Sequence, residues 1–418
     1  MGRLGEFGKG LQGISNRSVV QRIMESKPKQ SRPTPYHLGA RKLLAFLFLS
    51  WQILGGTKLV IAGEARSGGD TDWAKIVEAA KQEGQVTIYG TRGYQLIVDE
   101  DVFQKAYPGI KVITFSSSTS AFMQRLLAER RAGKNLADLA IAGGDSLSIL
   151  YESKYLKPLA SSFVLPEVLD QSKWWKKKHY LIDPERKYVF QYIGSPQFGS
   201  IYYNSKLFNP EGISSFWDFL NPKWKGKIEA GDIREGGSGN AAIRFYYYNR
   251  KLGPEFIKRL YGEMGVTLFR DSRQSVDWLA NGKFAICFFC VSSEIGRAAK
   301  QGLPIDTFDR LLKEGAALAG QSGTVGLMAD GPSPNAAKVF LNWLLSREGQ
   351  MTMQRAYVKA GVGASNSLRT DIPKDIVPAD QRLRDDVDYF EIELAETRDM
   401  RPVLEVFEAA LRSAEGKR

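Results

Sequence analysis

Histidine and cysteine are scarce in this sequence, which has two of each among 418 residues. His37 lies in the N-terminal segment, and His179 lies in an irregular aromatic and basic stretch. A serine or cysteine nucleophile would have to pair with His179, and no nucleophile elbow accompanies it. No HExxH, Walker A or EF-hand pattern occurs either. We therefore expect a protein that is not an enzyme. An exported hydrolase stays an alternative, because paired carboxylates, with Asp145 or Asp232 as candidates, have no fixed spacing.

The two cysteines occur as Cys287-Phe288-Phe289-Cys290 inside an apolar run, residues 284–291, that predicts a buried strand. On a strand, residues i and i+3 point to opposite faces and lie too far apart for a disulfide. A redox-active Cys-x-x-Cys motif normally opens a helix instead. The sequence therefore predicts two buried free thiols.

The positive charge is concentrated at the N-terminus. The formal net charge is +12, and residues 1–65 carry ten Lys/Arg against three Asp/Glu, a net of +7 that leaves 12 − 7 = +5 for the rest. A mildly basic body lacks the basic excess of a nucleic-acid binder, so we expect no nucleic-acid partner.

Long apolar runs are also rare. One follows Arg41-Lys42, covers residues 43–54, and leads to small residues where Gly63-Glu64-Ala65 fits a cleavage site. The run is shorter than the roughly 20 residues that span a bilayer. Residues 1–65 are therefore predicted to be a signal peptide that sends the protein to the periplasm, with an uncleaved anchor as the alternative.

Strand and helix patterns alternate along the remaining chain. Strands are expected at 86–89, 110–115 and 139–142, each followed by a helix, and the same order returns at 227–230, 266–269 and 284–291. This alternation predicts an α/β fold with doubly wound sheets in two lobes. The aromatic stretch Gln197–Asn204 stands between the two series and is interpreted as the crossing between the lobes.

Five loops rich in Gly, Ser or Thr follow these strands and open helices, at 90–94, 116–120, 143–146, 236–240 and 270–274. Ligands of open α/β sheets bind beyond the carboxyl ends of the strands, where helix N-termini attract oxygen atoms. Ordinary capping explains any one loop, whereas five indicate a cleft for a small polar solute. The predicted ligand-binding residues are Thr91, Arg92, Ser117, Ser118, Gly144, Asp145, Ser238, Gly239, Asn240 and Arg273, with Tyr203 and Phe288 as apolar walls.

Several segments resemble the solute-binding proteins of bacterial ABC transporters, in the subgroup that contains the ferric-iron-binding proteins. The likeness covers roughly residues 72–368 and is carried, in the right order, by PGIKV at 108–112, YNSKL at 203–207, NPKWKGKI at 221–228, DSRQSV at 271–276, and PNAAK at 334–338 with EGQ at 348–350.

The resemblance implies a two-lobed periplasmic-binding-protein-like fold of type II, with a solute in the interlobe cleft and hinge closure on binding. The expected boundaries are 70–195 plus 314–370 for lobe 1, and 196–313 plus 371–418 for lobe 2. The ferric subgroup uses a His, a Glu and two adjacent Tyr as ligands. Its tyrosine pair falls on Phe288-Phe289 here, its Glu near Gly143 and its His near Thr91-Arg92. A phenyl ring cannot bind Fe³⁺.

We therefore expect a monomeric periplasmic protein that captures a small anionic or zwitterionic solute and delivers it to an ABC permease, with no resident metal or cofactor. Three alternatives stay open. The first is iron, bound as a chelate or through Tyr94, Tyr202 and Tyr203. The second is the exported hydrolase, and the third is a sensor that presents its ligand to a membrane kinase.

Overall fold

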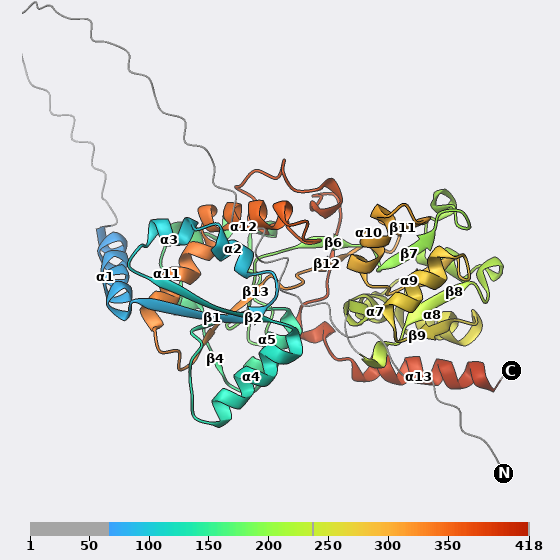
Figure 1. Cartoon of the computed structure of the whole chain (residues 1–418), viewed down its shortest axis with the longest axis horizontal. Helices are drawn as coiled ribbons and strands as arrows, with labels where there is room; N and C mark the ends of the chain where they lie inside the picture. The colour runs from blue at the N-terminus through green and yellow to red at the C-terminus, as the bar shows by residue number, and fades with distance from the viewer. Residues whose placement is uncertain (1–66, 236–237, 417–418) are drawn as a thin grey trace, which may run out of the picture. The chain divides into compact units, whose positions relative to one another are not determined.

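The computed structural model describes residues 67–235 and 238–416, so the predicted signal segment lies outside the described residues. Within them no helix is long and apolar enough to cross a membrane. The fold is mixed α/β, with two main sheets, a small third sheet and helices around them (Figure 1).

The first sheet has the order β2-β1-β3-β13-β4, with β5 also paired to β13. Its strands are β1 (Gln85–Thr91), β2 (Lys111–Ser117), β3 (Leu139–Ala142), β4 (Leu156–Lys157), β5 (Phe190–Gln191) and β13 (Thr324–Met328). β1 runs parallel to β2 and β3, whereas β13 arrives from a distant part of the chain and runs antiparallel to β3.

The helices that accompany this sheet are α1 (Ser67–Glu83), α2 (Gln95–Asp99), α3 (Val102–Ala106), α4 (Thr119–Arg131), α5 (Gly144–Glu152), α6 (Pro166–Leu169), α11 (Pro334–Leu345) and α12 (Arg347–Lys359). α1 lies beside α11 (Figure 1), and the Glu83 carboxylate at the end of α1 accepts the backbone N–H groups of Asn335 and Ala336. A carboxylate there satisfies free donors at the start of α11 and complements its dipole.

The second sheet has the order β11-β7-β10-β8-β9. Its strands are β7 (Ile201–Asn204), β8 (Ile228–Gly231), β9 (Thr267–Phe269), β10 (Ile286–Phe288) and β11 (Ile305–Phe308), and its helices are α7 (Ser238–Tyr248), α8 (Gly253–Glu263), α9 (Ser272–Ala280), α10 (Ser292–Lys300) and α13 (Arg401–Glu415). β8, β9 and β10 are parallel, while β7 is antiparallel to both of its neighbours. α13 packs on α8, with the Tyr261 and Phe407 rings 4.7 Å apart.

The chain passes between the two main sheets through the third one, which joins β6 (Ser195–Gln197), β12 (Ala317–Ala319) and β14 (Phe390–Glu391). The stretch Gln197–Asn204, predicted as the crossing between the lobes, thus contributes to two different sheets. Its first residue ends β6, and Ile201–Asn204 form β7 of the second sheet. Between them Gly199 and Ser200 have positive φ values of 82° and 55°, which turn the chain. The lobe boundaries given above stay predictions.

The Cys287–Cys290 prediction was wrong, because the two residues form a disulfide. The expected strand 284–291 is regular only over β10, Ile286–Phe288. Phe289 then takes a left-handed conformation with φ of 65°, which ends the alternation of faces. This turn brings the two Cα atoms to 6.0 Å, within the range for a disulfide.

His179 lies in the aromatic core near the first sheet. Its ring packs edge-on against Phe163, Trp174 and Phe190, and Nε2 lies 2.9 Å from the Val168 carbonyl oxygen. This environment is that of a core histidine rather than a catalytic base.

Burial lowers the pKa of His179 below its usual value. His179 therefore binds a proton more tightly in the unfolded chain than in the folded chain. The free energy of unfolding should fall as the pH drops through about 6.5. We expect the free energy of unfolding to decrease between pH 7 and pH 5, measured by urea unfolding. His179→Gln should lack this part of the loss, and an equal loss in both proteins would contradict the assignment.

Candidate functional site

A hollow of about 140 Å³ lies at the carboxyl ends of β8, β9 and β10. The lining residues come from the loops after these strands and from the first residues of α7 and α9; they are Gly231, Asp232, Ile233, Glu235, Gly239, Phe269, Arg270, Ser272, Phe289 and Val291. The parallel strands and the helices that follow them create this position, because strand ends and helix N-termini meet at one edge.

The charges around the hollow are largely paired. Arg234 donates two hydrogen bonds of 2.7 Å to the buried carboxylate of Asp232, and Arg270 adds one of 3.2 Å. The hydrogen bonds from Arg234 are the main reason that the pKa of Asp232 is lowered. Arg270 also lies 3.4 Å from Glu235 and is largely exposed. Asp232 is thus a fixed carboxylate that orients two guanidinium groups, not a general acid.

One glycine allows the backbone to come close to the aromatic wall of this hollow. A Cβ atom on Gly239, in the first turn of α7, would lie 3.1 Å from the Phe289 Cβ, whereas one on Gly231 would lie at an ordinary contact distance of 3.5 Å from it. The glycine at position 239 therefore serves the close approach of α7 to the loop after β10.

A second group of charged side chains joins α5, α7 and the segment before α13. Asp145 lies in the first turn of α5. One of its carboxylate oxygens lies 3.5 Å from Nη1 of Arg244, in α7, and 3.6 Å from Nε of Arg398. The two arginine side chains are only 2% and 9% exposed, whereas Asp145 is 64% exposed. Glu393 lies 3.9 Å from Arg398. We call Asp145, Arg244, Glu393 and Arg398 the arginine cluster.

Donor atoms in the arginine cluster lack hydrogen bonds, although they lie within ion-pair distance of Asp145. Arg244 Nη1 and Arg398 Nε are buried without a hydrogen bond among the residues described, and so is the amide oxygen of Asn240, one turn before Arg244. Burial raises the pKa of Glu393, while Arg244 and Arg398 lower it in part. An unpaired buried donor costs about 1–3 kcal/mol. The cluster therefore offers guanidinium donors that an oxyanion can satisfy.

A family model of bacterial extracellular solute-binding proteins matches residues 84–351, more than half of the chain. The chain belongs to this family. A solute-binding protein takes up a small molecule and presents it to the permease of an ABC transporter, and family and fold are those of binding proteins rather than enzymes.

Solved structures similar to this solute-binding protein share its type II fold at low sequence identity. The Trichodesmium protein IdiA (FutA), in complex with iron and citrate, matches with a TM-score of 0.55 and 16% identity over 80% of this chain and 99% of that one. A ferric-binding protein from Campylobacter jejuni matches with a TM-score of 0.54 and 16% identity, over 78% of this chain and 99% of that one. AfuA of Actinobacillus pleuropneumoniae, with fructose-6-phosphate bound, matches with a TM-score of 0.51 and 17% identity, over 79% of this chain and 99% of that one.

The residues predicted at the first sheet lie on neighbouring strand ends of this solute-binding protein. Thr91 and Ser117 are register partners at the ends of β1 and β2, and the Arg92 backbone N–H donates to the Ser117 carbonyl. Ser118 caps α4 by accepting from the Ala121 N–H. Gly144 lies against the arginine cluster, where a Cβ would meet Glu393 Oε2 at 2.6 Å. Asp145 joins that cluster, whereas the Arg92 side chain is exposed.

The residues predicted at the second sheet divide between the hollow and the core. Gly239 lines the hollow, Ser238 begins α7, and Asn240 stands one turn before Arg244. Arg273 is exposed in the first turn of α9. The prediction of Phe288 as an apolar wall was wrong. Phe288 is fully buried against Phe219 and Tyr246, and its neighbour Phe289 lines the hollow instead.

Tyr203 is also a core residue rather than a wall. It packs against Phe208, and its hydroxyl lies 3.5 Å from Asp306. Tyr202, Tyr203 and Tyr94, the tyrosines of the iron alternative, belong to three different hydrophobic clusters and do not share a site. The Tyr94 hydroxyl donates to the Ile88 carbonyl oxygen.

Sequence reasoning missed Arg244 and Arg398. The i, i+4 spacing places Arg244 on the same face of α7 as Asn240, so a helical projection from the glycine-rich loop would have indicated it. Arg398 lies in a segment without periodicity, and only the tertiary structure brings it to α5.

Proposed function

We propose that this solute-binding protein captures a small solute with a carboxylate or phosphate group, and that the arginine cluster holds that group. The observation that supports this most is the pair of buried guanidinium groups with unpartnered donor atoms beside the exposed Asp145. Guanidinium binds carboxylate and phosphate through charge-assisted hydrogen bonds, often two at a time.

Asp145 occupies the acceptor side of both arginines in the solute-free protein. Because Asp145 is mostly exposed, it can turn into water when a solute oxyanion takes its place. The amino end of α5 and that of α7 then add backbone N–H groups that favour negative charge.

The proposal extends to the setting of the protein. A periplasmic location reached through the N-terminal segment, a monomeric state, and delivery to an inner-membrane ABC permease are consistent with family membership. Ferric citrate is a second candidate solute, since the structurally similar Trichodesmium protein holds iron and citrate and the arginines suit citrate carboxylates. Bare Fe³⁺ does not suit this donor set, because guanidinium groups repel a cation.

A thermal-shift screen of the full-length chain tests the proposed solute class. The panel contains organic acids, phosphosugars, phosphonates, ferric citrate, polyamines and neutral sugars. At about 100 times its Kd, an anionic solute should stabilise the protein by about 2.7 kcal/mol and raise the Tm by a few degrees. Stabilisation by polyamines or neutral sugars alone, or by no compound, would contradict the proposal. A shift with ferric citrate but not with citrate would favour the iron chelate.

A further inference from the structure

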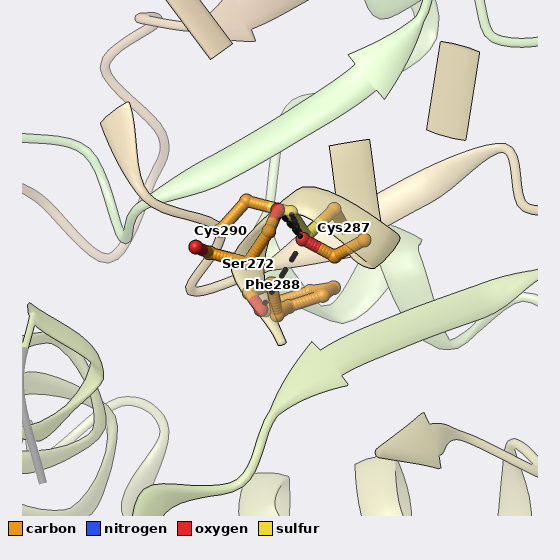
Figure 2. The surroundings of a disulfide bond; sticks show 5 residues. Ser272, Cys287, Phe288 and Cys290 are labelled. Atoms are coloured by element: carbon orange, nitrogen blue, oxygen red, sulfur yellow. Dashed lines mark hydrogen bonds between the residues drawn. A yellow bond between two sulfur atoms is a disulfide. The ribbon is translucent and has the colours of Figure 1, made fainter. Parts of the chain in front are cut away.

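The Cys287–Cys290 disulfide (Figure 2) lies next to the buried carboxyl group of Glu229. Glu229 of β8 is fully buried, as are both cysteines, and one ligand atom of each of the three lies within 4.8 Å of the others. No hydrogen-bond partner among the described residues reaches either carboxylate oxygen of Glu229.

Such a carboxyl group is costly. Transfer of an unpaired carboxylate from water to an apolar interior is strongly unfavourable, so buried acids are normally paired or bound to a metal. Burial raises the pKa of Glu229 to about 8, and the nearest opposing charge is that of Lys283, which also lies 3.8 Å from the Trp278 ring. Glu229 is therefore an acceptor without a donor while the cysteines are oxidised.

The strand register and one left-handed residue bring the three residues together. Glu229 and Cys287 are register partners in the parallel pair β8–β10, so their side chains leave the sheet on the same face. The left-handed Phe289 then returns Cys290 to that face. Its Sγ lies 3.5 Å from the Ser275 hydroxyl of α9.

We propose that, in the reduced protein, Cys287, Cys290 and Glu229 form a binding site for a thiophilic divalent cation such as Zn²⁺, which the disulfide closes. Exchange with a dithiol reductant breaks the S–S bond. Two electrons and two protons pass to the cysteines, and the reductant leaves as a cyclic disulfide. The cation then displaces both thiol protons and the proton that Glu229 carries at neutral pH, and it binds two thiolates and one carboxylate, a donor set that zinc accepts.

A water molecule would complete the four ligands that zinc takes. Phe289 and Val291, on either side of Cys290, line the hollow, although none of the three proposed ligands does. Three negative ligands exceed the charge of one divalent cation, and Lys283 offsets part of the excess. Binding would therefore link the redox state of the cysteines to the wall of the hollow.

Zinc titration of the full-length protein in its two redox states tests the site. One sample is reduced with a dithiol and freed of reductant under argon, and the other stays oxidised. We expect one Zn²⁺ per chain in the reduced sample only, measured by calorimetry. Co²⁺ should give a thiolate charge-transfer absorption there. This comparison needs no variant, so it does not depend on the folding of a mutant.

Variants separate this site from adventitious binding. Cys287→Ser should abolish binding, and Glu229→Gln should weaken it at least 10-fold. Glu263→Gln is the matched control, because this exposed acid of α8 lies outside the hollow, and it should leave the affinity unchanged. No binding by the reduced protein, equal binding by the oxidised protein, or unchanged affinity in Glu229→Gln would overturn the proposal.

Discussion

We expect Arg244→Gln to weaken solute binding by about 100-fold. The Arg244 side chain is 2% exposed, so water cannot replace its contact with a bound oxyanion. Truncating one partner of a buried charged pair costs about 2–5 kcal/mol, and 100-fold corresponds to about 2.7 kcal/mol. Calorimetry with the solute that the screen identifies measures the change. Circular dichroism and the Tm without solute show whether the variant is folded.

Asp145→Asn should act in the opposite direction. Its carboxylate competes with the solute for Arg244 and Arg398, from 3.5 and 3.6 Å, so removal of its charge should tighten binding several-fold. Arg412→Gln, an arginine of α13 that is 69% exposed, is the matched control and should change nothing. If the arginines only fastened α7 to α5, Arg244→Gln and Asp145→Asn would both lower the Tm, and neither would change the affinity. That outcome would remove the cluster from the binding site.

The second large effect concerns stability, at Gly349 in the first turn of α12. A Cβ there would overlap the carbonyl oxygen of Trp343 and would lie 2.7 Å from that of Leu344, both backbone atoms of the preceding helix. Backbone cannot yield as the end of a side chain can. We therefore expect Gly349→Ala to lower the free energy of unfolding by about 3–5 kcal/mol, measured by urea unfolding. Gly349 is the glycine of the EGQ segment, so close packing of α11 on α12 accounts for it.

Gly296→Ala provides the control for this prediction. Gly296 lies in the interior of α10, and a Cβ there would have no neighbour within 4 Å. Alanine is the better helix former, so this variant should gain about 0.5–1 kcal/mol. Equal effects at the two glycines would show that helix propensity, not the contact with α11, decides the change.

Sequence patterns located the elements that carry a clear local signal. The strand at 139–142 was predicted with its observed ends, because it is a short apolar run bounded by turn residues. The segment between the first two strands holds two short helices, α2 and α3, because Asp101 takes a left-handed conformation between them. Periodicity does not report the sign of φ at one residue.

The same limit explains the disulfide. A Cys-x-x-Cys segment in an apolar run reads as a strand with opposed side chains, and only the turn at Phe289 reverses the second cysteine. Phe288 and Phe289 are likewise equivalent in sequence, and the alternation of β10 sends Phe288 into the core while its neighbour lines the hollow.

By itself, then, the sequence determined the fold class, the family and the loops at the strand ends, because these follow from local periodicity, turn residues and short motifs. The tertiary structure alone decided which charges meet. Asp145, Arg244 and Arg398 lie far apart in the chain, and they come together because β13 enters the first sheet from a distant segment and residues 386–400 return to α5. Contacts between such distant segments depend on packing, which no local pattern records.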